Sequence, residues 1–196
     1  MSPAQVPKRP HPHAPHSRDL DARVTHFVSP VTRMLLASEG LTTPLLQAAS
    51  DGPLRARVWS LREVAAGLLD PGARERLRLS GQERCLVRRT RLVLACGTTV
   101  SDNVVVARMG VDPRVDEVAG DPGQPLGFGL ADAGVVLRRR VHWVGRRRWF
   151  GGGPCVCKAY TLDAVDGPLV HVEELFSPQV VPADVRVTHS PQGQST

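Results

Sequence analysis

The clearest alternation of side chains in the chain lies in residues 167–178, GPLVHVEELFSP. Its period of two predicts a β-strand whose apolar face carries Val170 and, unexpectedly, Glu174. Aspartate and glycine at residues 166–167 predict the tight turn of a hairpin whose first arm is residues 155–165. A carboxylate on an apolar strand face needs a cation or a hydrogen-bond donor. The pattern leaves two interpretations of Glu174 open, a structural ion pair or part of a ligand site.

The remaining hydrophobic pattern predicts helices first and strands afterwards. Short helices are expected at residues 30–37, 42–49, 61–69, 73–79 and 125–131. Strands are expected at residues 54–59, 82–96, 100–109 and 135–144, besides the final hairpin. Residues 110–124 indicate a loop, and residues 146–154 indicate a mobile insertion. This order predicts an α+β fold, a single antiparallel sheet of about six strands with helices packed on one face.

The length of 196 residues suits one domain with a hydrophobic core of its own. Residues 1–22 are rich in proline, histidine and serine and are expected to form a disordered tail. The domain is expected at residues 23–185, followed by a flexible tail at residues 186–196. The histidines at positions 11, 13 and 16 offer metal ligands, but a solvated tail is the simpler interpretation.

The formal net charge of +6 comes from arginine, because Lys8 and Lys158 are the only lysines. Arginine prefers fixed, bidentate contacts to carboxylate or phosphate, so an anionic ligand, buried ion pairs and nucleic acid all fit the charge. Aromatic residues make up only 4% of the chain, which argues against a base-stacking surface for nucleic acid. A protein that binds nucleic acid through the arginines of residues 138–140 and 146–148 is still kept as a hypothesis, besides the two given below.

The four cysteines form no CxxC pair, and no histidine lies at finger spacing from them, which disfavours a zinc site. Free thiols in a reducing cytosol are the simplest interpretation of these cysteines. No segment approaches about 18 consecutive apolar residues, and the N-terminus has no apolar signal-peptide core. We therefore expect a cytoplasmic protein that binds neither a metal nor a membrane.

Residues 87–94, VRRTRLVL, are the first stretch that could carry chemistry. Arg89 and Arg91 share one face of the expected strand, whereas Arg88 lies on the other face with Thr90. Two arginines on one strand face, beside a carboxylate on a neighbouring strand, would hold a small dianion. The simpler interpretation is an exposed basic strand face.

Two turns offer further polar groups. Leu126 and Gly127 follow Pro125 at an expected helix start, so their backbone N–H groups are free to bind a carboxylate. The same residues are equally consistent with a plain helix start. Leu41 and Thr42 lie in the elbow between the two early helices, where they would cover a pocket or form only a turn. No Ser–His–Asp arrangement, P-loop or Rossmann motif is present in the sequence.

Six short pieces of the sequence, in their order and spacing, resemble the chorismate pyruvate-lyase family, the enzymes that make 4-hydroxybenzoate. They are MLLASEGLTTPLLQ, LVRRTRLVLACG, VVVARM, PLG, CKAYTL and GPLVHVEELFSP. The resemblance implies a chorismate lyase-like fold, with a six-stranded antiparallel sheet, helices on one face and a lidded, buried pocket. In that pocket chorismate would lose its enolpyruvyl side chain as pyruvate, without a metal or an organic cofactor. We expect such an enzyme to be a monomer.

The same fold serves as the effector-binding domain of some bacterial transcription regulators, without catalysis. A non-catalytic module that senses an aromatic acid is therefore the alternative to a carbon–oxygen lyase. The sequence shows no winged-helix module before the domain, which favours the enzyme.

The resemblance also implies roles for individual residues. The family arginine falls on Arg91 when counted from the cysteine of the strand, or on Arg89 when counted from the turn glycine. The glutamate of the family's E-L-F motif falls on Glu174. Arg91 and Glu174 are thus the predicted catalytic pair. Arg91 would neutralise a substrate carboxylate, and Glu174 would hydrogen-bond the ring hydroxyl and assist proton movement.

The other implied site residues bind the substrate with backbone groups or cover it. The family leucine whose backbone N–H meets the ligand carboxylate falls on Leu126, with Gly127 beside it. Leu41 and Thr42 fall on the flap that covers the pocket.

Overall fold

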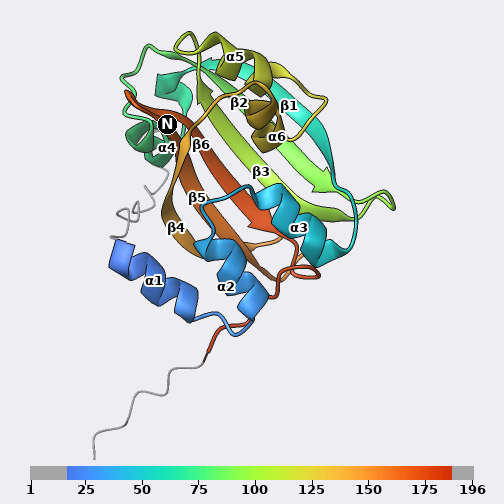
Figure 1. Cartoon of the computed structure of the whole chain (residues 1–196). Helices are drawn as coiled ribbons and strands as arrows, with labels where there is room; N and C mark the ends of the chain where they lie inside the picture. Colours follow the sequence, from blue (N-terminus) through green and yellow to red (C-terminus); the bar gives the residue numbers. More distant parts are fainter. Residues whose placement is uncertain (1–16, 187–196) are drawn as a thin grey trace, which may run out of the picture.

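The computed structural model describes residues 17–186 of the chain. Its centre is one six-stranded antiparallel sheet in the order β1-β2-β3-β6-β5-β4 (Figure 1). The strands are β1 (Arg55–Ala65), β2 (Arg84–Val93), β3 (Thr99–Arg108), β4 (Arg138–Arg148), β5 (Pro154–Ala164) and β6 (Gly167–Phe176). The predicted fold class is confirmed, and so is the final hairpin, which supplies β5 and β6.

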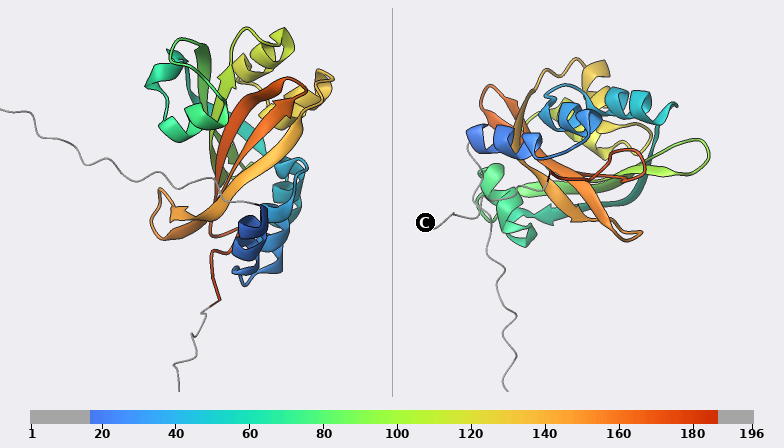
Figure 2. Two further views of the ribbon diagram at one scale, coloured as in Figure 1. Left: turned by 90° about the vertical axis from the view of Figure 1, so that its left-hand side faces the viewer. Right: turned by 90° about the horizontal axis from the view of Figure 1, so that it is seen from below.

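Most of the helices lie on one side of the sheet. The helices are α1 (Ser17–Thr25), α2 (Pro30–Ala37), α3 (Thr42–Ser50), α4 (Pro71–Arg76), α5 (Pro113–Gly120) and α6 (Leu126–Asp132), with a 3₁₀ turn at Ala66–Leu68. Figure 2 (left) shows α2, α3, α5 and α6 on one side of the sheet and α4, in green, on the other. Helix α1 lies along the edge strand β4. We call the side covered by α2, α3, α5 and α6 the helix face.

The helix face carries two apolar clusters, because alternate residues of each strand point to it. The cluster under α5 and α6 includes Leu130 and Val172. The cluster under α2 and α3 includes Leu46 and Phe176. A third, smaller cluster around Leu77 packs α4 against the opposite face. The helices thus enclose two separate hydrophobic regions on one face of one sheet.

Three predicted segments within the domain differ in the structure. Residues 61–69 do not form the predicted helix, because β1 continues to Ala65 through backbone pairing with β2 and only a 3₁₀ turn at Ala66–Leu68 follows it. Residues 146–154 form the end of a hairpin, because β4 runs to Arg148 and a turn leads directly into β5. Gly152 and Gly153 adopt φ values of +94° and +74° in that turn, a backbone conformation that glycine takes without strain. The predicted loop at 110–124 also contains α5.

The predicted N-terminal tail ends earlier than residue 22, because Ser17–Thr25 forms α1. Leu20 and Val24 pack α1 against the second apolar cluster. At the other end, Val185 pairs with Phe27 in an isolated β-bridge, and the Arg186 N–H donates to a backbone carbonyl. The histidines at positions 11, 13 and 16 and the tail from residue 187 lie outside the described residues.

The described part of the chain has three further properties that bear on function. Its four cysteines are free, with Cys96 exposed and the other three buried. None of its helices is long and apolar enough to cross a membrane. No group of three or more His, Cys, Asp or Glu side chains within residues 17–186 is arranged to hold a metal ion.

Candidate functional site

A row of polar residues crosses the helix face between the two apolar clusters. Thr90, Asn103, Glu174 and Lys158 are cross-strand neighbours on β2, β3, β6 and β5. All four side chains are buried. Buried polar groups are stable only when they are hydrogen-bonded or paired, so each of these residues needs a polar partner.

Glu174 finds its partner on α3. Its Oε2 accepts a hydrogen bond from the Thr42 hydroxyl at 3.0 Å, and the Thr42 oxygen accepts one from Arg139 Nη1 at 2.8 Å. The Arg139 guanidinium also lies 4.1 Å from the centre of the Tyr160 ring. Glu174 is therefore linked to a buried cation, Arg139, through Thr42. We call α2, α3 and the residues between them the flap.

Tyr160 adds a neutral hydroxyl to this network. Its burial, followed by the negative charge of Glu174, raises the pKa of the phenol. The phenol therefore keeps its proton at neutral pH and can donate a hydrogen bond. The network combines one carboxylate, one phenol and one guanidinium in a space without bulk water.

Lys158 fastens the flap to the sheet. Its side chain is 0% exposed, and its Nζ donates to the Leu35 carbonyl at 3.2 Å and to the Ser38 carbonyl. These carbonyls lie at the end of α2, where a helix favours a positive charge. Burial lowers the pKa of Lys158 to about 8, against the opposing effect of Glu174. The sequence analysis missed this role, although Lys158 is the single lysine within the predicted domain.

Arg88 is a buried cation held by carbonyl groups. It is 1% exposed, and its Nη2 donates to the Gln124 carbonyl at 2.6 Å while Nη1 reaches the Val118 carbonyl at 3.3 Å. Its Nε donates to the Thr90 hydroxyl at 3.0 Å. Burial lowers the pKa of Arg88. Within the described residues no carboxylate lies within ion-pair distance of Arg88, and only the more distant charge of Asp121 opposes the effect of burial on its pKa.

The predicted pairing of Arg91 or Arg89 with Glu174 is wrong, because both arginines lie on the opposite face of the sheet. Arg91 Nε lies 3.5 Å from Asp102 Oδ1, and Arg89 lies 5.5 Å from the ring centre of Trp59. A bulge between β2 and β3 next to Leu92 shifts the register by one residue. Without this bulge, counting residues back from the β2–β3 turn would place Arg89 and Arg91 on the face of Glu174. The observed pairing places Arg88 on that face instead.

The flap meets the turn that starts α6. The first hydrogen bonds of α6 run from the Phe128 and Gly129 N–H groups to the Pro125 carbonyl. The N–H groups of Leu126 and Gly127 come before these and take no part in the helical hydrogen bonds. A Cβ placed on Gly127 would lie 2.9 Å from Leu41 Cδ2. The α6 turn and the flap are thus in close contact over the sheet.

These groups line a cavity of about 50 Å³. Its lining includes Leu41, Thr42, Arg88, Leu126, Gly127 and Glu174. Such a volume holds one or two water molecules, whereas ligand pockets measure about 300–1,000 Å³. A ring-sized ligand would enter only after the flap moves. Asn103 Oδ1, which is buried at the same place, has no hydrogen-bond partner among the described residues.

The structure thus brings together five of the seven predicted site residues and separates two. Leu41, Thr42, Leu126, Gly127 and Glu174 line one cavity, whereas Arg89 and Arg91 do not reach it. Arg139 and Tyr160 join the site without having been predicted, because their strands are far apart in the sequence from Thr42. The assembled charges are two arginines and one glutamate around the cavity, a balance that favours an anionic ligand.

No protein-family model matches the chain, and neither does any curated protein. Solved structures do match its fold. The effector domain of PhnF from Mycobacterium smegmatis has a TM-score of 0.57 at 12% identity, over 72% of this chain and 91% of that one. The C-terminal domain of the histidine utilization repressor from Pseudomonas syringae has a TM-score of 0.51 at 14% identity, over 73% and 99%.

A third match is the ligand-binding domain of a putative GntR-family transcriptional regulator from Bordetella bronchiseptica. Its TM-score is 0.50 at 13% identity, over 71% of this chain and 92% of that one. At these identities the likeness establishes a shared fold. That fold is the one that the sequence resemblance implied for effector-binding domains of regulators.

Proposed function

We propose that the domain is a binding module for a small organic anion, which it takes into the cavity beneath the α2–α3 flap. The observation that carries the proposal is the position of Arg88, a buried cation that lines the cavity, is held in place by backbone carbonyls and has no carboxylate within ion-pair distance in the described residues. A ligand carboxylate would place a negative charge in direct contact with Arg88. The N–H groups of Leu126 and Gly127 would bind the same carboxylate.

The rest of the site suits a hydroxyl group on that ligand. Glu174 is an acceptor and the Tyr160 phenol is a neutral donor, so both hydrogen-bonding roles of a hydroxyl are available. Val172 and Leu162 supply an apolar wall for a ring between the two polar ends. A hydroxylated aromatic carboxylate such as 4-hydroxybenzoate therefore matches the site in charge and polarity. The fold shared with effector and ligand-binding domains supports the same type of function.

Chorismate pyruvate-lyase activity is the second candidate, and the desolvated carboxylate of Glu174 is the observation that favours it. Chorismate would bind through its ring carboxylate at Arg88 and through its ring hydroxyl at Glu174. Cleavage of the ether C–O bond would release pyruvate, and loss of the ring proton would give 4-hydroxybenzoate. Because Glu174 is already held by Thr42, its part would be to position the substrate and accept a hydrogen bond.

One pair of measurements separates the two functions. Purified full-length protein is titrated with 4-hydroxybenzoate in a calorimeter and is incubated separately with chorismate, while pyruvate and 4-hydroxybenzoate are assayed. Saturable binding without turnover supports the binding module. Turnover of chorismate establishes the lyase. Neither binding nor turnover of these compounds would overturn both proposals for an aromatic ligand.

A further inference from the structure

The face of the sheet opposite to the proposed site is hollowed into a groove of about 950 Å³. Side chains of β1 and β4, the two edge strands, both line it, so the sheet is curled around it. Figure 2 (left) shows α4 and the tip of the β4–β5 hairpin projecting on this same side, at opposite ends of the sheet. At the hairpin end the Phe150 ring lies 4.3 Å from the Arg91 guanidinium of β2. Helix α4 thus lines one end of the groove, and the β4–β5 hairpin projects beside the other end.

Arginine side chains surround the groove. They come from β1, α4 and the residues after it, β2 and β4, and are Arg62, Arg76, Arg78, Arg89, Arg140 and Arg147. Three of the four carboxylates that line it already have partners, and Glu173, described below, is one of the three. Asp70 accepts from the Gly72 N–H at 2.9 Å at the start of α4, and Asp163 lies 3.4 Å from Arg140. Arg76 and Arg140 are ion-paired, whereas Arg62, Arg78, Arg89 and Arg147 form no ion pair within the described residues. The Arg147 guanidinium lies 4.1 Å from the centre of the Trp143 ring.

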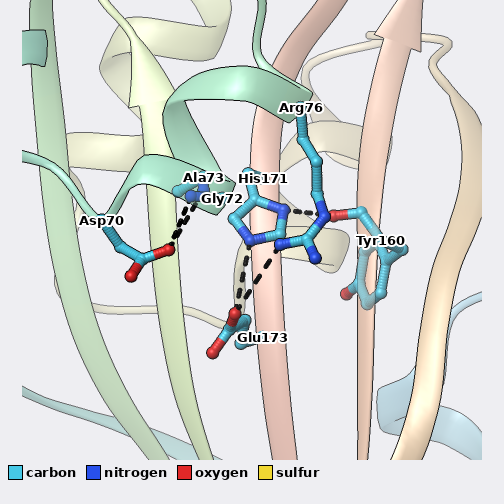
Figure 3. Close-up of polar contacts among 7 residues, drawn as sticks. All are labelled: Asp70, Gly72, Ala73, Arg76, Tyr160, His171 and Glu173. Atoms are coloured by element: carbon cyan, nitrogen blue, oxygen red, sulfur yellow. Dashed lines mark hydrogen bonds and ion pairs between the residues drawn. The ribbon is translucent and has the colours of Figure 1, made fainter. Parts of the chain in front are cut away.

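The floor of the groove holds a histidine with an unsatisfied nitrogen (Figure 3). His171 is 2% exposed, and its Nδ1 donates to the Tyr160 carbonyl at 3.1 Å. Its Nε2 makes no hydrogen bond within the described residues and lies 3.7 Å from Glu173 Oε1. Arg76 reaches down from α4 to within 4.0 Å of the same carboxylate oxygen. Burial lowers the pKa of His142 beside them to about 4, so that histidine stays neutral.

An aromatic surface lies next to this charge. Trp59 is 54% exposed at a bulge of β1, and it lines the groove beside the Arg89 guanidinium. Val87, Val104 and Val106 form an apolar strip of the floor. An exposed indole, an apolar floor and several free arginines together match a ligand that has a flat ring system and more than one phosphate.

We propose that this groove is a nucleotide-binding site, which takes a nucleoside di- or triphosphate. The base would lie against Trp59, and the phosphates would lie between Arg62 of one edge strand and Arg147 of the other. A groove of this volume falls within the range of small-molecule pockets. Two copies of so basic a groove would repel each other, which disfavours a face-to-face dimer.

Binding of ATP to the full-length protein, followed by tryptophan fluorescence and calorimetry, tests this proposal. We expect saturable one-to-one binding that weakens as salt is added. The double variant Arg62→Gln/Arg147→Gln should bind ATP about tenfold or more weakly, since it loses two charged contacts. Arg55→Gln is the matched control, because Arg55 is an equally exposed arginine of β1 that does not line the groove. Its affinity for ATP should be unchanged.

Inorganic diphosphate and a single-stranded oligonucleotide complete the test. ATP should bind more tightly than diphosphate, and Trp59→Leu should remove that advantage. Equal affinity for ATP and diphosphate, equal losses in the Arg55 control, or no ATP binding would each overturn the proposal. So would tighter binding of the oligonucleotide, or a dimer whose formation ATP does not affect and which blocks the groove. The affinity for 4-hydroxybenzoate, which would bind on the other face, should be the same in all these variants. The proposals for the two sites are therefore tested independently.

Discussion

The hydroxyl group of Thr42, in the first turn of α3, donates a 3.0 Å hydrogen bond to Oε2 of Glu174 in β6. The same oxygen accepts from Arg139 of β4, so one threonine joins the flap to two strands. Thr42→Val keeps the shape of the side chain and removes both bonds. It leaves a buried carboxylate oxygen without its donor, which should lower the free energy of unfolding by about 1–3 kcal/mol in denaturant titrations.

Thr42→Ser is the control for this variant, since it keeps the hydroxyl and removes only a methyl group. Its free energy of unfolding should lie much closer to that of the wild type. If the valine and serine variants were equally stable, the hydrogen bond between Thr42 and Glu174 would not hold the flap.

Lys158 should make stability depend on pH in the alkaline range. Its pKa falls from an ordinary value of 10.5 to about 8 in the folded protein, because burial disfavours the charged form. Between these two values the unfolded chain binds more protons than the folded one, so stability rises with pH. This contribution is complete above pH 10.5 and is lost as the pH falls through about 8.

Lys158→Met isolates the effect. The difference in unfolding free energy, wild type minus variant, should increase between pH 8 and 10.5 by up to about 3 kcal/mol. Urea titrations of both proteins across this range provide the measurement. A difference that stays flat would show that Lys158 is not buried as an ammonium group under the flap.

Gly127→Ala tests the contact between the α6 turn and the flap. Alanine favours a helix over glycine by up to about 1 kcal/mol, so the thermal midpoint should stay the same or rise. The new Cβ would nevertheless meet Leu41 Cδ2 at 2.9 Å and displace that side chain. Affinity for 4-hydroxybenzoate should therefore fall although stability does not. Unchanged affinity would place the ligand away from this turn.

The hydrophobic pattern predicts the sheet well because a strand period of two is a local property. It identifies the β5–β6 hairpin and the unusual position of Glu174 on an apolar face, and both are present in the structure. It predicts the β1 extension and α1 poorly. Arg62 and Glu63 interrupt the alternation in β1, and α1 is stabilised by packing onto distant residues that a local pattern does not show.

The site itself is predicted only in part, for two physical reasons. A one-residue bulge next to Leu92 decides that Arg88, and not Arg91, lies on the face of Glu174, and no residue type marks that bulge. Arg139 and Lys158 reach the site by pairing across strands and by contact with α2 and α3, which are long-range features. The groove on the opposite face depends on the curl of the whole sheet. It is invisible in the sequence of any single strand.

The most direct test of the account compares Arg88 with Arg91 in calorimetric titrations with 4-hydroxybenzoate. Arg88→Lys keeps the charge but loses the planar, bidentate geometry, and circular dichroism would verify that the variant is folded. Arg91→Lys makes the same change on the opposite face. We predict saturable binding by the wild type, a loss of about tenfold or more in Arg88→Lys, and an affinity within about twofold of the wild type in Arg91→Lys. Unaltered binding by Arg88→Lys, with the loss in Arg91→Lys instead, would contradict the account.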